Sequence, residues 1–113
     1  RNDDLIKSAG YRIGPTEVEA AMLAHPAVAE AAAVASPDPL RGHIVKGFVR
    51  LRAGATPSAD LARGIQETVK ARLAAHQYPR EIEFVDDFPR TTTGKILRSE
   101  LRAREARRAG SLP

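Results

Sequence analysis

The chain has 113 residues, with 18 Lys and Arg against 14 Asp and Glu, a net charge of +4, and no cysteine. This length corresponds to one domain that can bury a core, but it is short for a complete enzyme that handles a large cofactor. The lack of cysteine excludes disulfides, thiolate metal sites and a cysteine nucleophile, and the three histidines lie too far apart to form a metal motif. We therefore expect a fragment or accessory domain without a metal site of its own.

Neither a membrane span nor a signal peptide is expected. No apolar run approaches the roughly 20 residues that cross a bilayer, and the chain starts with Arg-Asn-Asp-Asp, where a signal peptide would be basic. A chain without cysteine also suits a reducing compartment. We expect a cytoplasmic protein.

Much of the positive charge lies near the end of the chain. Aromatic residues that could stack on bases are few, and none is interleaved with these charges. We expect a solvated helix here, and the rival hypothesis is a basic module that binds RNA or another polyanion. The charged residues of this segment are Arg98, Glu100, Arg102, Arg104, Glu105, Arg107 and Arg108.

The first elements predicted are a hairpin and a helix. Residues 5–13 have apolar positions on both sides of a turn at Gly10, which is typical of a short β-hairpin. A helix should follow, either with Pro15 in its first turn or with Thr16 and Glu19 as a capping box.

Two strands and a second helix follow. Residues 28–36 alternate between prolines, and residues 45–52 alternate more clearly. The loop at 37–42 is short, so we expect the two strands to pair antiparallel. In the next segment, capped by Thr56 or Ser58, apolar residues recur every four positions, which predicts a core helix.

The remaining elements are a third strand at 81–85 and a last helix anchored by Leu97 and Leu101. The residues after about Ala109 are expected to fray. The order hairpin, helix, strand, strand, helix, strand, helix predicts a small α+β domain with helices packed on a three-stranded sheet.

The loop Pro89-Arg90-Thr91-Thr92-Thr93-Gly94-Lys95 carries the clearest chemical signal. Gly94 permits a tight bend, and Lys95 beyond it could reach the anion site of another domain as a compact point charge. The loop lacks the spacing of a nucleotide P-loop. On these residues alone, a polar turn with a solvated lysine is the competing interpretation.

Two motifs at opposite ends of the chain resemble those of AMP-forming acyl-CoA synthetases, members of the adenylating superfamily. Residues 1–15, RNDDLIKSAGYRIGP, resemble the hinge motif, and residues 89–98, PRTTTGKILR, resemble the last motif of that family. The similarity runs from Arg1 to about Arg104. The segments GYRIGP, PDPLRG and YPREIEFV look most like the medium-chain or aromatic-acid CoA ligases, which more often have alanine at the position of Gly47.

The resemblance implies a two-step reaction. A carboxylate attacks ATP to give acyl-adenylate and pyrophosphate, and the thiol of CoA then displaces AMP, with the small domain rotating between the steps. Lys95 would act in the first step, and Asp3 would be the hinge. Arg1 would contact the ribose of the adenylate, and Arg12 would either lie near the nucleotide or steady the rotated state.

By the same resemblance, Ala9, Gly10 and Tyr11 would line the path of the CoA pantetheine arm. Residues Arg41, Lys70 and Tyr78 fall at positions that contact the rest of CoA in the medium-chain enzymes. A related branch loads a carrier-protein pantetheine instead. That alternative would leave Arg41 and Lys70 without a nucleotide to hold.

Residues 1–109 would thus form the C-terminal domain, residues 110–113 a tail, and the large N-terminal domain would be absent. That domain would supply the acid pocket and most of the site for ATP with Mg²⁺, so this fragment alone should be inactive. The expected partners are a carboxylic acid, ATP, CoA and the N-terminal domain, with no nucleic acid. A lysine acetyltransferase acting on Lys95, a regulation known in related synthetases, would remove its charge.

Overall fold

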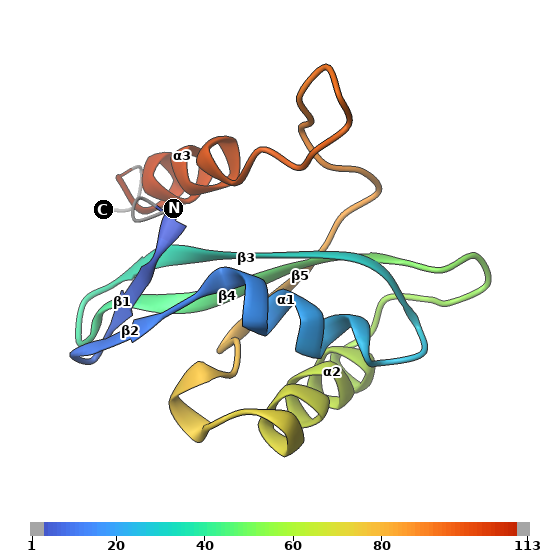
Figure 1. Cartoon of the computed structure of the whole chain (residues 1–113), viewed down its shortest axis with the longest axis horizontal. Helices are drawn as coiled ribbons and strands as arrows, with labels where there is room; N and C mark the ends of the chain where they lie inside the picture. The colour runs from blue at the N-terminus through green and yellow to red at the C-terminus, as the bar shows by residue number, and fades with distance from the viewer. Residues whose placement is uncertain (1–3, 111–113) are drawn as a thin grey trace.

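The computed structural model describes residues 4–110, and it confirms the predicted α+β class (Figure 1). Asp3 and Arg1 lie outside the described residues, as do residues 111–113 of the expected tail. The elements are β1 Ile6–Ser8, β2 Tyr11–Ile13, α1 Pro15–Leu23, β3 Val28–Asp38, β4 Gly42–Leu51, α2 Ala59–Arg72, the 3-10 helix η2 Ala75–Gln77, β5 Glu81–Phe84 and α3 Arg98–Gly110.

The main sheet has the order β3-β4-β5, and β1 pairs with β2 as a separate hairpin. As predicted, β3 and β4 are antiparallel, whereas β5 runs parallel to β4. The predicted bounds of the loop, 37–42, are wrong at both ends, because the β3–β4 ladder continues to the pair Asp38 and Gly42. The Asp38 carboxylate accepts hydrogen bonds from the Leu40 and Arg41 amides, which closes the turn within residues 39–41.

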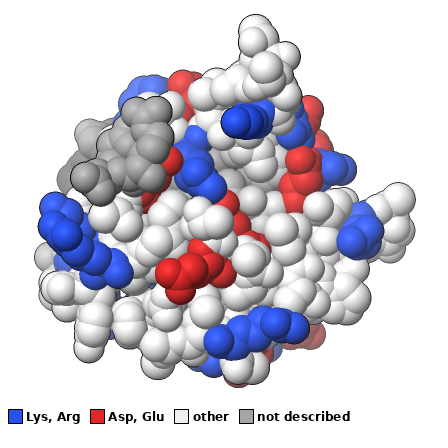
Figure 2. Space-filling view, viewed as in Figure 1, with Lys and Arg blue, Asp and Glu red and all other residues white. Residues whose placement is uncertain are grey.

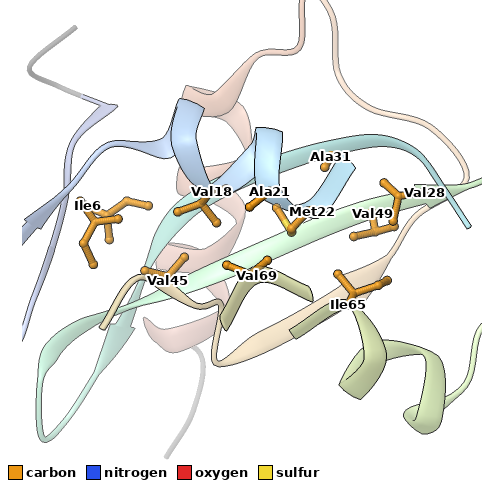
Figure 3. Close-up of a cluster of buried hydrophobic side chains, with 12 residues drawn as sticks. Ile6, Val18, Ala21, Met22, Val28, Ala31, Val45, Val49, Ile65 and Val69 are labelled. Carbon is orange, nitrogen blue, oxygen red and sulfur yellow. The ribbon is translucent and has the colours of Figure 1, made fainter. Parts of the chain in front are cut away.

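Helices α1 and α2 cover one face of the sheet and α3 lies over the other (Figure 1). The first face buries the larger core, in which side chains from β3, β4 and both helices point toward one another (Figure 3). The second face buries Ala32, Val34 and Phe48 against Phe88 and Leu101. Both faces of the sheet are therefore covered. Alternate residues along a strand enter two different cores, whereas in a sheet covered on one side every second residue would face solvent.

Helix α1 shows how the sequence sets a boundary. The helix begins with Pro15 in its first turn after an extended Gly14, with no side-chain cap. Of the two predicted starts, the Pro15 start is therefore observed. Glu19 does not act in a capping box, because its carboxylate accepts the Ala33 amide of β3 at 2.8 Å.

Gly47 in the middle of β4 has a packing reason. A Cβ built at this residue would lie 2.8 Å from Met22 Sδ and 3.0 Å from Ile82 Cδ1. Met22 and Ile82 thus occupy the space next to this backbone, and the ends of both side chains would have to shift to admit an alanine methyl.

Lys46 is the main departure from the expected pattern. Its side chain is only 2% exposed, and its Nζ donates to Glu105 at 2.9 Å and to Glu83 at 2.8 Å. Ser36 also donates to Glu105 at 2.9 Å. The buried ammonium and carboxylate are each multiply hydrogen-bonded, as buried charges must be. Helix α3 is therefore joined to the sheet through a buried ion pair.

The prediction of a solvated terminal helix is wrong for the inner side of α3. Arg98 donates to both Glu19 oxygens, at 2.7 and 2.5 Å, and Arg102 donates to Asp4 at 2.5 Å. These pairs connect α3 with α1 and with the start of the described chain. Some of the arginines in this segment are therefore paired with acidic residues that are distant in sequence.

We predict that Lys46→Met lowers the free energy of unfolding at pH 7 by about 3 kcal/mol, because it removes the buried cation from Glu105 and leaves that carboxylate with the half-exposed Arg108. Burial acts to raise the pKa of Glu105, but hydrogen bonds from Lys46 and Ser36 hold it below its usual value. That contribution to stability is complete above the usual pKa and lost as the pH falls through the lowered one.

The difference between Lys46→Met and the unchanged chain should therefore shrink below about pH 4. Urea titrations at several pH values measure it. Arg63→Met, which breaks the exposed pair with Asp60, is the control and should change little. An equal loss for the two variants would contradict the buried-pair interpretation.

Candidate functional site

The loop between β5 and α3 forms a closed turn that presents Lys95. The Thr91 amide donates to the Lys95 carbonyl at 2.8 Å, and the Gly94 amide donates to the Thr91 carbonyl at 2.9 Å. Thr91 Oγ1 also accepts from the Lys95 amide at 3.1 Å. Gly94 has φ of 90°, a conformation that favours glycine. Lys95 follows at the base of this turn with its side chain exposed.

The surface beside Lys95 is hollowed, and its two arginines are ion-paired with carboxylates. Lys95, Arg98, Arg102 and one carboxylate, Asp4, line a hollow of about 490 Å³, and Asp4 is ion-paired with both arginines. Burial acts to raise the pKa of Asp4, but the hydrogen bond and charge of Arg102 outweigh this and lower it. Asp4 therefore stays ionised and neutralises part of the positive charge. The hollow is lined by Asp4, Thr91, Lys95, Ile96, Leu97, Arg98, Ser99 and Arg102.

The turn of the β1–β2 hairpin is the second candidate surface. Ala9 and Gly10 both have positive φ, 52° and 86°, as two-residue hairpin turns require. A Cβ on Gly10 would have no heavy atom within 4 Å, so this backbone borders open space. The Ala9 amide donates to the Arg41 carbonyl at 3.4 Å. The turn and Arg41, predicted separately, are thus neighbours.

The other residues expected at CoA are held by ring contacts. The Tyr11 ring stacks on His76 of η2, with centroids 3.9 Å apart and planes at 15°. Lys70 Nζ lies 4.3 Å from the centroid of Tyr78, and Arg80 Nη1 donates to the Tyr78 hydroxyl at 3.2 Å. These contacts attach the hairpin to η2 and place two cations around one aromatic ring.

The two candidate surfaces are separate. In Figure 1 the hairpin turn is at the lower left, whereas the loop that carries Lys95 projects at the top. Arg12 lies on β2 directly opposite Lys7, both of them exposed, so two cations sit side by side next to the turn. The structure does not gather Gly10 and Lys95 into one fixed pocket.

The described surface gives little support for a continuous basic patch on the face in view. Figure 2 shows Lys and Arg interspersed with Asp and Glu, with uncharged surface between them. Within residues 4–110, no three His, Asp or Glu side chains are placed to hold a metal ion. Among the same residues no helix has the length and apolar character needed to cross a membrane.

Sequence reasoning missed His76 and Arg90 at these two surfaces. His76 contacts Tyr11 across 65 positions of sequence, and no local pattern signals such a contact. Arg90 lies inside the predicted loop motif and donates to the Gly94 carbonyl. Its place four residues before Gly94 could have indicated this contact.

The family model described as "AMP-binding enzyme C-terminal domain" matches residues 17–95. The 4-hydroxybutyrate--CoA ligase 1 of Metallosphaera sedula is 53% identical over 105 residues, covering 93% of this chain and 19% of that protein.

Solved structures agree. The acyl-CoA synthetase of Brucella canis superposes with a TM-score of 0.92 at 51% identity, covering 96% of this chain and 20% of its own. The anthranilate CoA ligase AuaEII in complex with anthranoyl-AMP gives 0.91 at 40% identity, covering 97% and 21%. The chain spans about a fifth of the length of these relatives. It belongs to the family of AMP-binding enzyme C-terminal domains.

Proposed function

We propose that this chain is the mobile C-terminal domain of an ATP-dependent acyl-CoA synthetase, which forms an acyl-adenylate and then transfers the acyl group to CoA. The observation that carries the proposal is that the β5–α3 loop, which contains Lys95, and the β1–β2 turn, which contains Gly10, lie on separate surfaces of one small domain (Figure 1). A domain with two such surfaces can serve two successive reactions by rotating against its partner domain.

In the first reaction, Lys95 would be presented to the carboxylate and the α-phosphate of ATP. Its charge would offset the repulsion between two anions that must meet. A unit-charge pair at about 4 Å is worth about 4 kcal/mol at most with an effective dielectric near 20. That energy corresponds to a rate factor of order a thousand. Arg98 and Arg102 in the adjoining hollow are paired with Glu19 and Asp4, so the charge offered to the anionic partner would be chiefly that of Lys95.

In the second reaction, the hairpin turn would border the pantetheine arm of CoA. The open space over Gly10 would let the thiol pass close to the backbone. Arg41 and the pair Lys70 and Tyr78 would hold the nucleotide end by charge and by stacking. Arg12 would either lie near the nucleotide or steady the rotated state.

The remaining parts of the enzyme would come from the N-terminal domain. It would supply the acid pocket, which decides the carboxylic acid, and hold ATP with Mg²⁺ in a cytoplasmic enzyme. The hinge at Asp3 and the ribose contact by Arg1 remain predictions. The exposed amine of Lys95 is open to acetylation, which would delete the charge used in the first reaction.

We predict that Lys95→Ala in the complete protein slows adenylate formation by about 100-fold to 1000-fold and leaves thioester formation from preformed acyl-adenylate within about threefold. The first rate is measured by carboxylate-dependent pyrophosphate exchange and the second by release of AMP on addition of CoA. Arg63→Ala, which alters an exposed residue of α2, is the control. Equal losses in both reactions would overturn the assignment.

The complementary variant is Gly10→Leu, which should abolish most thioester formation while pyrophosphate exchange is retained, because the side chain would fill the path of the thiol. Gly54→Leu is the matched control, since Gly54 also has positive φ, 90°, and open space around it. It carries the same backbone strain at a site away from both surfaces. Loss of exchange to the same extent as thioester formation in Gly10→Leu would rule out the pantetheine path.

A further inference from the structure

Arg90 is the side chain that joins the Lys95 turn to the sheet. Its Nη1 donates to the Gly94 carbonyl at 3.1 Å. Its Nη2 donates to Glu30 at 2.5 Å and to Asp87 at 3.0 Å. One guanidinium thus binds the peptide directly before Lys95 and two carboxylates of the domain body, a use of the planar fork that lysine cannot reproduce.

The carboxylates that hold Arg90 are themselves fixed. Glu30 lies on β3 and also accepts from Arg50 of β4 at 2.6 Å. Hydrogen bonds from Arg90, the largest contribution, and from Arg50 lower the pKa of Glu30. Asp87 receives the Phe88 amide at 2.8 Å, which with Arg90 lowers its pKa as well. Both groups stay charged near neutral pH, so the anchor persists where an enzyme works.

Phe88 and Ile96 are packed on the second core at the two ends of the turn, but beyond them its own bonds hold its shape more than its direction. The bonds of Thr91 with Gly94 and Lys95 lie within the turn, and Thr92, Thr93 and Gly94 are exposed. At its base, the Leu97 amide donates to the Pro89 carbonyl at 2.8 Å. Arg90 contributes a contact between the far side of the turn and β3.

We propose that Arg90 is a positioning residue for Lys95: by binding the Gly94 carbonyl against Glu30 and Asp87, it fixes the direction in which the ammonium group is presented. The inference rests on the function proposed for Lys95 above. Misplacement of a catalytic group by about 1 Å can cost of order 100-fold in rate, so loss of this anchor should slow the reaction that uses Lys95 and spare the one that does not.

The experiment uses the complete protein. Arg90→Gln is expected to lower kcat for pyrophosphate exchange about 10-fold to 100-fold, with thioester formation from preformed acyl-adenylate within about threefold. Arg90→Lys keeps the charge without the planar fork. Its rate of pyrophosphate exchange should lie between those of Arg90→Gln and the unchanged protein. If Arg90→Gln does not fold, Arg90→Lys carries the same test. Arg63→Gln is the control arginine on an exposed helix face.

A double-mutant cycle separates positioning from stability. When Lys95 is already Ala, adding Arg90→Gln should cause no further loss of exchange, because nothing remains to be positioned. An additive loss, an unchanged exchange rate in Arg90→Gln alone, or equal slowing of both half-reactions would each overturn the inference. Failure of the function itself is recognised independently, since Lys95→Ala alone would then slow both half-reactions equally.

Discussion

The arrangement of the domain follows from one constraint, which is that the β3–β4 pair is buried on both faces. Helices α1 and α2 with the hairpin cover one face, and the chain must then pass from β5 to the other face to place α3 there (Figure 1). The segment that makes this crossing is fastened by Phe88 and Ile96 on the second core. The Lys95 turn projects from that crossing. A solvent-exposed loop can carry a charge to another domain because its two ends are held by burial.

Charged contacts add to the apolar packing that attaches α3 to the rest of the domain. The second core contains few large side chains, and α3 is held there partly by the buried pair of Lys46 with Glu105. Around the edge strand β3, Glu19 of α1 binds Arg98 of α3. Such pairs offset their own desolvation only when several hydrogen bonds converge, as they do at Glu105. They specify how the layers align more than they add to stability.

The sequence predicted the elements well and their long-range contacts poorly. Alternation found β4, the Ser58 side chain does cap α2 by accepting the Leu61 amide at 3.0 Å, and the hairpin follows from its glycine turn. These signals are local. The partner of Lys46 lies 59 residues away, and no periodicity reports it.

In the candidate site, too, local features were predicted from the sequence and long-range contacts were not. The Lys95 loop and the Gly10 turn were predicted from motifs that are continuous in sequence, because each motif encodes its own turn. The contact of Ala9 with Arg41 and the stacking of Tyr11 on His76 depend on how separate elements pack, so they required the structure.

Both candidate surfaces are built in a way that suits a domain moving as one body. At the hairpin, paired strands and the Tyr11–His76 stack hold the turn, and at the loop Arg90 ties Gly94 to a strand of the sheet. If either turn were free, each rotation would have to order it again, at a cost of about 1–2 kcal/mol per residue fixed. In the function proposed here, placing each turn on a fixed support would confine the motion to the hinge, so that a change of angle alone would decide which chemistry the domain presents.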